Sequence, residues 1–232
     1  MLKFVRGLMQ EDSRIIELRS NVHIKNMLEK VGYPFKSKEY SQKYYEYKFL
    51  GYRSPSYIRF AECERSYSAP KCLKYQFEDS FKEKYSHFCC WELKKIPAKH
   101  WAHANNKSIV LTGMQGEEGG QRANISCVSF DKKGYLQKFH PLLPVSNGWE
   151  WALITYENLK ICELYYPPYS FERTGCKGCP FNKEIKKDLA TMEKHLPAER
   201  KQCEYLWKPV YEEYRRIGYR LDKEGGRGND IF

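Results

Sequence analysis

The pattern of apolar and polar positions predicts a helix-rich chain. Between Asn21, a good N-cap, and Gly32, apolar side chains recur at helical spacing, so we expect a helix that packs its apolar stripe on a core. Residues 36–50 are also typical of a helix, with tyrosines and lysines interleaved. Further helices are expected over residues 71–84, from Cys89-Cys90 onward, and over residues 155–165, 183–195 and 197–218.

One segment is clearly typical of a strand. Residues 108–113 form an apolar run that ends at Gly113, which predicts a buried strand. The loop from Met114 to Arg122 follows its carboxyl end, where ligands bind in α/β sheets. Residues 51–69 carry Pro, Ser and Tyr and are expected to be a loop, and residues 222–232 a flexible tail.

The charge balance indicates an anionic partner. The chain has 40 Lys and Arg against 29 Asp and Glu, a net charge of +11, and its 41% hydrophobic content is too high for a disordered chain. Alternating tyrosines and lysines over residues 40–48 suit nucleic-acid binding. A helix that packs its tyrosines on the core and leaves its lysines in water is the favoured interpretation.

Neither a membrane span nor a secretory signal is expected. The longest purely aliphatic stretch is Ile109–Leu111, whereas a membrane helix needs about 20 mostly apolar residues. Lys3 and Arg6 interrupt the apolar residues at the N-terminus. Nine cysteines, an odd number, argue against a disulfide framework and favour reduced thiols or metal ligands. We therefore expect a cytoplasmic protein.

Two pairs of cysteines are the strongest chemical signal. Cys89 and Cys90 are adjacent, and Cys176 and Cys179 form a CxxC motif flanked by glycines. Four thiolates are what a cubane iron–sulfur cluster requires. Adjacent cysteines on a helix point about 100° apart, which suits two corners of a cluster better than one tetrahedral zinc.

Other interpretations of the cysteines stay open at this point. The CxxC motif alone predicts a zinc knuckle or a redox pair, with Cys89 and Cys90 as buried apolar side chains. Cys63 and Cys72 are further candidate ligands of a zinc site that the CxxC motif would complete, although the eight residues between them differ from the usual ligand spacing. Cys203 lies in a predicted helix and is expected to be a packed thiol.

Three blocks of sequence resemble the phosphoadenosine phosphosulfate (PAPS) reductase family. They are HFCCWELKKIP at residues 87–97, TGMQGEEGGQR at residues 112–122 and RTGCKGCPF at residues 173–181, and they occur in the family's order. The resemblance extends over roughly residues 20–218 and implies an α/β, adenine-nucleotide-hydrolase-like (PP-loop) fold. We expect one domain over residues 1–221, with a helix-rich C-terminal part.

The resemblance also implies a site. In cluster-bearing members a CC pair and a CxxC motif hold a [4Fe-4S] cluster beside the substrate, and carried over these ligands are Cys89, Cys90, Cys176 and Cys179. The loop after the strand is similar to the family's donor-binding loop. It would place Glu118 and Arg122 at the nucleotide or sulfur-donor site, where the substrate is ATP or adenylyl sulfate.

Three departures from the family pattern change the expected function. The PP-loop sequence Ser-Gly-Gly-Lys-Asp-Ser is absent, so the domain is expected to be N-terminally incomplete and to need a PP-loop-bearing subunit or a homo-oligomer. Residues 221–232 contain no cysteine, whereas the reductases carry a reactive one in their tail. Gln115 and Gly119 stand where the family usually has Arg and Ser.

Two classes of function follow. The first is an iron–sulfur protein that acts in sulfur activation, reduction or transfer from an adenylylated donor, as an oxidoreductase or a sulfurtransferase. Because the family's relatives include enzymes that insert sulfur into DNA, a nucleic-acid acceptor would suit the positive charge. The second is a non-catalytic nucleic-acid-binding protein with a structural zinc at the CxxC motif. An inactive remnant is a third interpretation.

Overall fold

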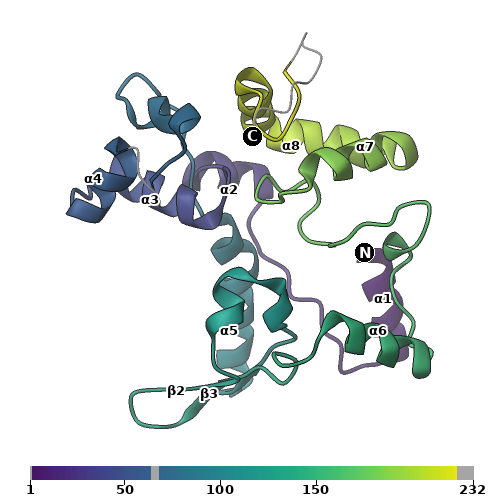
Figure 1. Cartoon of the computed structure of the whole chain (residues 1–232). Coiled ribbons are helices and arrows are strands. Elements are labelled where there is room, and N and C mark those ends of the chain that lie inside the picture. Colours follow the sequence, from purple (N-terminus) through teal and green to yellow (C-terminus); the bar gives the residue numbers. More distant parts are fainter. Residues whose placement is uncertain (1, 64–67, 224–232) are drawn as a thin grey trace. The chain divides into compact units, whose positions relative to one another are not determined.

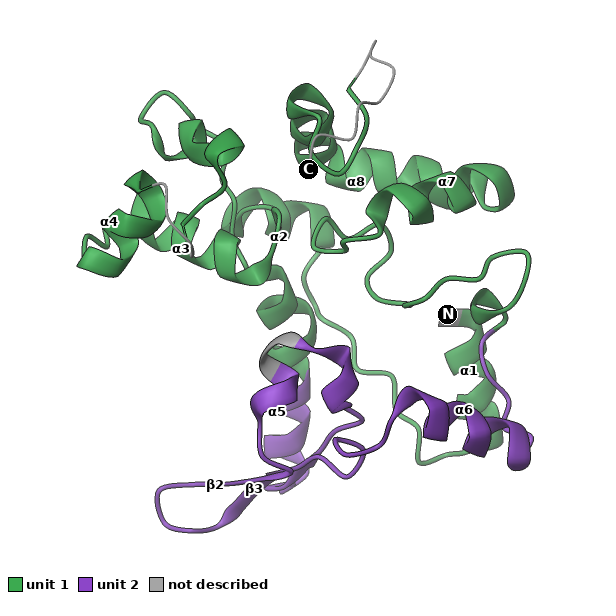
Figure 2. Cartoon of the chain, viewed as in Figure 1, with its two compact units in different colours: residues 1–97, 163–232 green, residues 98–162 purple. Residues whose placement is uncertain are grey.

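The structure, a computed structural model, describes residues 2–63 and 68–223. The chain divides into two compact units, residues 1–97 with 163–232 and residues 98–162 (Figure 2). The single domain expected over residues 1–221 stays a prediction, and residues 224–232 of the expected tail lie outside the described residues. Within the described ranges, no helix is both long and apolar enough to cross a membrane.

The first unit is helical (Figure 1). Its elements are α1 (Leu2–Glu11), α2 (Ile24–Val31), α3 (Lys38–Phe49), α4 (Pro55–Glu62), a 3₁₀ helix (Lys71–Phe77), a π-helix (Trp91–Lys95), a 3₁₀ turn (Glu163–Tyr165), α7 (Ile185–His195) and α8 (Pro197–Ile217). The structure confirms the helices predicted within residues 21–32, 36–50, 183–195 and 197–218. Ser37 begins α3 by accepting a hydrogen bond from the backbone N–H of Tyr40, and α8 ends at the left-handed Gly218.

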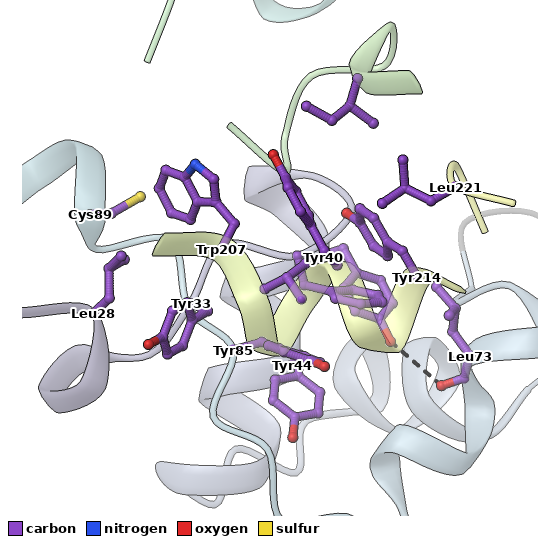
Figure 3. Packing of buried hydrophobic residues seen from close by; sticks show 14 of the residues in the cluster. Leu28, Tyr33, Tyr40, Tyr44, Leu73, Tyr85, Cys89, Trp207, Tyr214 and Leu221 are labelled. Carbon is purple, nitrogen blue, oxygen red and sulfur yellow. Dashed lines mark hydrogen bonds between the residues drawn. The ribbon is translucent and has the colours of Figure 1, made fainter. Parts of the chain in front are cut away.

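Aromatic side chains form most of the core of this unit. Tyr40 and Tyr44 of α3 are fully buried, and Figure 3 shows them in the core with Tyr85. Their rings pack with those of Phe35, Phe77 and Tyr85. Tyr40 and Tyr44 therefore pack on the core, as the favoured interpretation predicted, whereas Tyr45 and Tyr47 of the same helix are half-buried. The hydroxyl of Tyr40 donates to Gln76 at 2.7 Å, so its polar end is satisfied inside the core.

Two stretches of this unit differ from the sequence predictions. Residues 51–69, expected to be a loop, contain α4, which begins at Pro55 because proline suits the first turn of a helix. The helix expected over residues 71–84 stops at Phe77. A turn follows, in which the N–H of Phe81 donates to the carbonyl of Glu78, and Tyr85 then bridges to Tyr33. Aromatic packing of residues 77–85 on the core outweighs their helical spacing.

A continuous helical segment runs from Cys89 to Ala104, which confirms a helix start at the cysteine pair. Its middle part, Trp91–Lys95, is a π-helix, and α5 (Ile96–Ala104) follows. Pro97 has no N–H and its ring clashes with the carbonyl four residues earlier, so the turn widens. The N–H of Ile96 accordingly bonds to the carbonyl of Trp91, five residues back.

The second unit holds a three-stranded mixed sheet and α6 (Asn147–Tyr156). The strands β1 (Val110–Leu111), β2 (Val128–Phe130) and β3 (Leu136–Phe139) lie in the order β1-β3-β2, with β1 parallel and β2 antiparallel to β3. The buried strand predicted at residues 108–113 is thus a short, exposed one. The prediction of a helix over residues 155–165 is wrong. Helix α6 ends at Tyr156, and the next helical turn is the short 3₁₀ turn Glu163–Tyr165.

Candidate functional site

Cys89 and Cys90 open the helical segment that leads into the π-helix. Cys89 is buried in the core and Cys90 is half-buried. Figure 3 shows the sulfur of Cys89 directed towards the ring of Trp207 from α8. A hydrogen bond from the Cys89 thiol lowers the pKa of Cys90 to about 6, while the same bond and burial raise the pKa of Cys89. In this pair, Cys90 is therefore the thiol that ionises first, while Cys89 keeps its proton.

Cys176 and Cys179 lie in a tight turn that precedes α7, in the C-terminal segment of the first unit. The N–H of Cys179 donates to the carbonyl of Cys176 at 3.0 Å, and both thiols are half-buried. Gly178 between them has a φ of +62°, the left-handed conformation that glycine adopts without strain. Burial raises the pKa of Cys179 to about 11, against a hydrogen bond from the N–H of Phe181.

The fold brings the two cysteine pairs together. The charges of Cys179 and Cys176 both raise the pKa of Cys89, after its bond to Cys90 and its burial. Cys176 and Cys90 in turn raise the pKa of Cys179, after burial. Thiols with 85 residues between them in the sequence thus interact electrostatically within one unit.

The charges of nearby lysines act on two of these thiols. The hydrogen bond from Cys89 lowers the pKa of Cys90 most, and burial opposes it. The positive charges of Lys38, Lys94 and Lys95 lower this pKa further. Lys94 also lowers the pKa of Cys179, as a minor effect beside burial. Lysines close to thiols stabilise thiolates and attract anionic ligands.

The cysteine turn is bound to α8 through its carbonyl groups. Trp207 Nε1 donates to the carbonyl of Lys177 at 2.9 Å, the Tyr211 hydroxyl to that of Gly178 at 2.5 Å, and the Tyr214 hydroxyl to that of Pro180 at 3.0 Å. All three donors are buried. The sequence prediction of the site did not include them. Their spacing of four and three residues along one helix was the available signal.

Among the described residues, no three or more His, Cys, Asp or Glu side chains form a group that could hold a metal ion. The evidence that the two cysteine pairs lie near each other is thus the effect of each pair's charge on the pKa of the other pair's thiols. Their role as metal ligands stays a prediction.

Glu118 and Arg122 lie in the second unit, on the loop that follows β1. Their side chains form an ion pair one helical turn apart. Gln115 on the same loop is 7% exposed and donates to Glu150 Oε2 at 3.1 Å, so this side chain, where the family usually has Arg, is tied into its own unit. The substrate-binding role of Glu118 and Arg122 stays a prediction.

Cys203 is a packed thiol, as expected. It is 1% exposed and its Sγ lies 3.9 Å from the sulfur of Met192. Burial raises its pKa, which opposes a role as a nucleophile.

The phosphoadenosine phosphosulfate reductase domain model matches residues 57–182. This range contains both cysteine pairs and the loop with Glu118 and Arg122. No curated protein matches the chain, and no solved structure does. Since the matched range is more than half of the 232 residues, the chain belongs to the phosphoadenosine phosphosulfate reductase domain family.

Proposed function

We propose that this chain is an iron–sulfur protein that acts in the activation, reduction or transfer of sulfur from an adenylylated donor. The observation that carries the proposal is the mutual interaction of Cys89, Cys90, Cys176 and Cys179 within one unit of a PAPS reductase-family chain. Four thiols are the number and kind of ligand that a [4Fe-4S] cluster takes.

The donor set fits a cluster better than a single ion. The four iron atoms of a cubane lie at separate corners, so its thiolates need not converge on one point as zinc ligands do. Cys90 is predisposed to bind as a thiolate, because Cys89 donates to it and three lysines lie near it. When bound, the cluster would position or polarise the sulfur-bearing group beside it.

The lysines near Cys90 support an anionic substrate. Lys38, Lys94 and Lys95 would bind sulfate or phosphate oxygens and neutralise their charge next to the thiols. Glu118 and Arg122 of the second unit are the residues that we propose bind the sulfur donor. Arg122 pairs with Glu118, so it would have to break this ion pair in order to bind the anion.

The nucleotide part of the substrate needs contacts from elsewhere. Backbone N–H groups of a glycine-rich loop normally bind phosphates, and the 232 residues contain no PP-loop sequence. We therefore propose that a PP-loop-bearing subunit, or a homo-oligomer, completes the site for ATP or adenylyl sulfate. A nucleic acid is the proposed acceptor that the net charge of +11 would favour.

Anaerobic purification with iron, acid-labile sulfide and zinc counted per chain tests the cluster. We expect iron and sulfide near four each, with a broad visible absorption band. The double variant Cys89→Ser/Cys90→Ser should lose both. The matched control is Cys162→Ser, a change at a buried cysteine of the other unit, which should retain them.

Zinc near one per chain without sulfide would contradict the cluster and support a structural zinc at the CxxC motif. In that case, loss of the Cys89-Cys90 thiols should leave the zinc content largely unchanged, because the CxxC pair would be its main ligand.

A further inference from the structure

The hydrogen bonds between α8 and the cysteine turn act on both sides of each peptide group. In a trans peptide the C=O and the N–H point in opposite directions. A donor that holds the carbonyl on one side therefore also sets where the N–H points on the other side.

The peptide between Gly178 and Cys179 is the first case. Its carbonyl accepts from the Tyr211 hydroxyl at 2.5 Å, and its N–H, which belongs to Cys179, donates to the carbonyl of Cys176 at 3.0 Å. Tyr211 thus holds the peptide in the orientation that closes the turn and sets the separation of the two thiols.

The peptide between Pro180 and Phe181 is the second case. Its carbonyl accepts from the Tyr214 hydroxyl at 3.0 Å and from Arg220 Nη1 at 2.8 Å. Its N–H, on Phe181, bonds to the side chain of Cys179. Two donors on one side therefore direct one N–H at a sulfur on the other.

The space around the turn is filled as well. A Cβ atom at Gly178 would lie 2.7 Å from the Tyr211 hydroxyl and 2.6 Å from the Sγ of Cys203. The same tyrosine that holds the carbonyl thus closes off the space on the helix side, and the turn has little freedom to change its backbone conformation.

We infer that Tyr211, Tyr214 and Arg220 are positioning residues of the thiol site, which act on Cys176 and Cys179 through the peptide groups of the turn. Hydrogen bonds to ligand sulfurs are one of the factors that set the properties of iron–sulfur centres. The purpose of this arrangement rests on the proposed cluster, whereas the peptide orientations are a property of the metal-free chain.

Amide hydrogen exchange of the reduced, metal-free full chain, followed by NMR, tests the inference. Tyr211→Phe should speed exchange of the Cys179 amide, and Tyr214→Phe that of the Phe181 amide, each by at least about fivefold, the change expected from losing one ordinary hydrogen bond. The control is Tyr205→Phe, which removes the hydroxyl of an exposed tyrosine on the same helix that bonds to Lys25. It should leave both amides unchanged.

The second readout is the rate at which a chelator removes iron from the loaded protein, which we expect to rise in Tyr211→Phe and Tyr214→Phe but not in Tyr205→Phe. If Tyr214→Phe does not fold, Arg220→Met removes the other donor to Pro180 and takes its place. Unchanged exchange at both amides in folded variants would overturn the inference. Absence of iron from the wild-type chain would contradict the proposed cluster and leave the exchange result to decide the positioning role.

Discussion

The backbone N–H of Lys36 donates a hydrogen bond to the hydroxyl oxygen of Tyr214 at 2.8 Å. The same hydroxyl donates to the carbonyl of Pro180 at 3.0 Å, so one buried oxygen joins the segment before α3 to the cysteine turn. Lys36 itself has a φ of +57°, an uncommon conformation for a lysine. Three parts of the sequence that are far apart therefore meet at one side chain of α8.

Tyr214→Phe should lower the free energy of unfolding by about 1–3 kcal/mol, because the part-buried N–H of Lys36 would lose its acceptor. The carbonyl of Pro180 would keep its bond from Arg220, so the loss should lie on the Lys36 side. Urea denaturation of the full chain measures the change.

Tyr205→Phe provides the comparison for this loss, since the side chain is 65% exposed and its hydroxyl can be replaced by water. A change below about 0.5 kcal/mol is expected there. Equal losses in the two variants would contradict a special role for the Tyr214 hydroxyl.

Glu213→Gln should make the chain's stability less dependent on acid pH. Burial alone would raise the pKa of Glu213, but hydrogen bonds from Arg216 and Tyr75 outweigh it and hold the pKa below its usual value. Arg216 Nε lies 2.7 Å from the carboxylate. The ionised form therefore stabilises the fold above the unfolded-state pKa of about 4.3, and that contribution is lost as the pH falls through the folded-state pKa.

The expected result is a variant less stable than wild type at pH 7, by about 1–3 kcal/mol, and a difference that shrinks below about pH 4. Denaturation midpoints at a series of pH values measure it. Glu212→Gln changes the neighbouring exposed carboxylate, which pairs with Lys208 at 3.7 Å, and should follow the wild-type curve. A constant difference between Glu213→Gln and wild type at all pH values would contradict the role of the charge.

Helices whose ends carry local signals could be predicted from sequence. Gly32 ends α2, Pro197 begins α8 and Gly218 ends it, and each works through backbone conformation alone. The exposure of the strand at residues 108–113 and the end of the helical segment at Phe77 could not, because neighbouring chain segments decide both. The family implies an α/β adenine-nucleotide-hydrolase-like fold, and the described part is helix-rich with one small sheet.

The identity of the candidate thiols could be predicted from sequence, whereas their surroundings could not. Cys89-Cys90 and the CxxC motif are local patterns, and the resemblance joined them. The bonds from Trp207, Tyr211 and Tyr214 depend on how α8 lies against the turn. Hydrogen bonds to backbone carbonyls leave no residue-type signal at the acceptor, so only the helix spacing of the donors indicated them.

Gly178→Ala should be strongly destabilising. Its φ of +62° costs an alanine about 1–2 kcal/mol, and the added Cβ would meet Cys203 and Tyr211 at less than 3 Å. Repacking around such a clash typically costs about 1–3 kcal/mol more. Thermal and urea denaturation measure the loss.

The control for this variant is Gly51→Ala. Gly51 has a similar φ of +70°, but nothing lies within 4 Å of its Cβ position. The difference between the two variants therefore isolates the steric part. If Gly51→Ala were as destabilising as Gly178→Ala, the contact with Tyr211 and Cys203 would not explain the glycine.

Asp188→Asn should raise stability at neutral pH. Burial raises the pKa of Asp188 to about 6, although a hydrogen bond from Asn182 Nδ2 at 2.7 Å opposes the shift. Asn182 follows the cysteine turn, and its N–H bonds to the carbonyl of Cys179. An amide at position 188 keeps an acceptor for Asn182 and cannot ionise.

The direction of the pH effect follows from the raised pKa. Between the unfolded-state pKa of about 3.9 and the folded-state value of about 6, the folded chain binds more protons, so wild-type stability falls as the pH rises through this window. Asp188→Asn should lack that fall, match wild type near pH 4 and exceed it at pH 7. Glu193→Gln, at an exposed carboxylate near the end of α7, should behave as wild type in the same denaturation series. Parallel curves for Asp188→Asn and wild type would show that Asp188 is solvated in the folded chain and that its ionisation carries no cost.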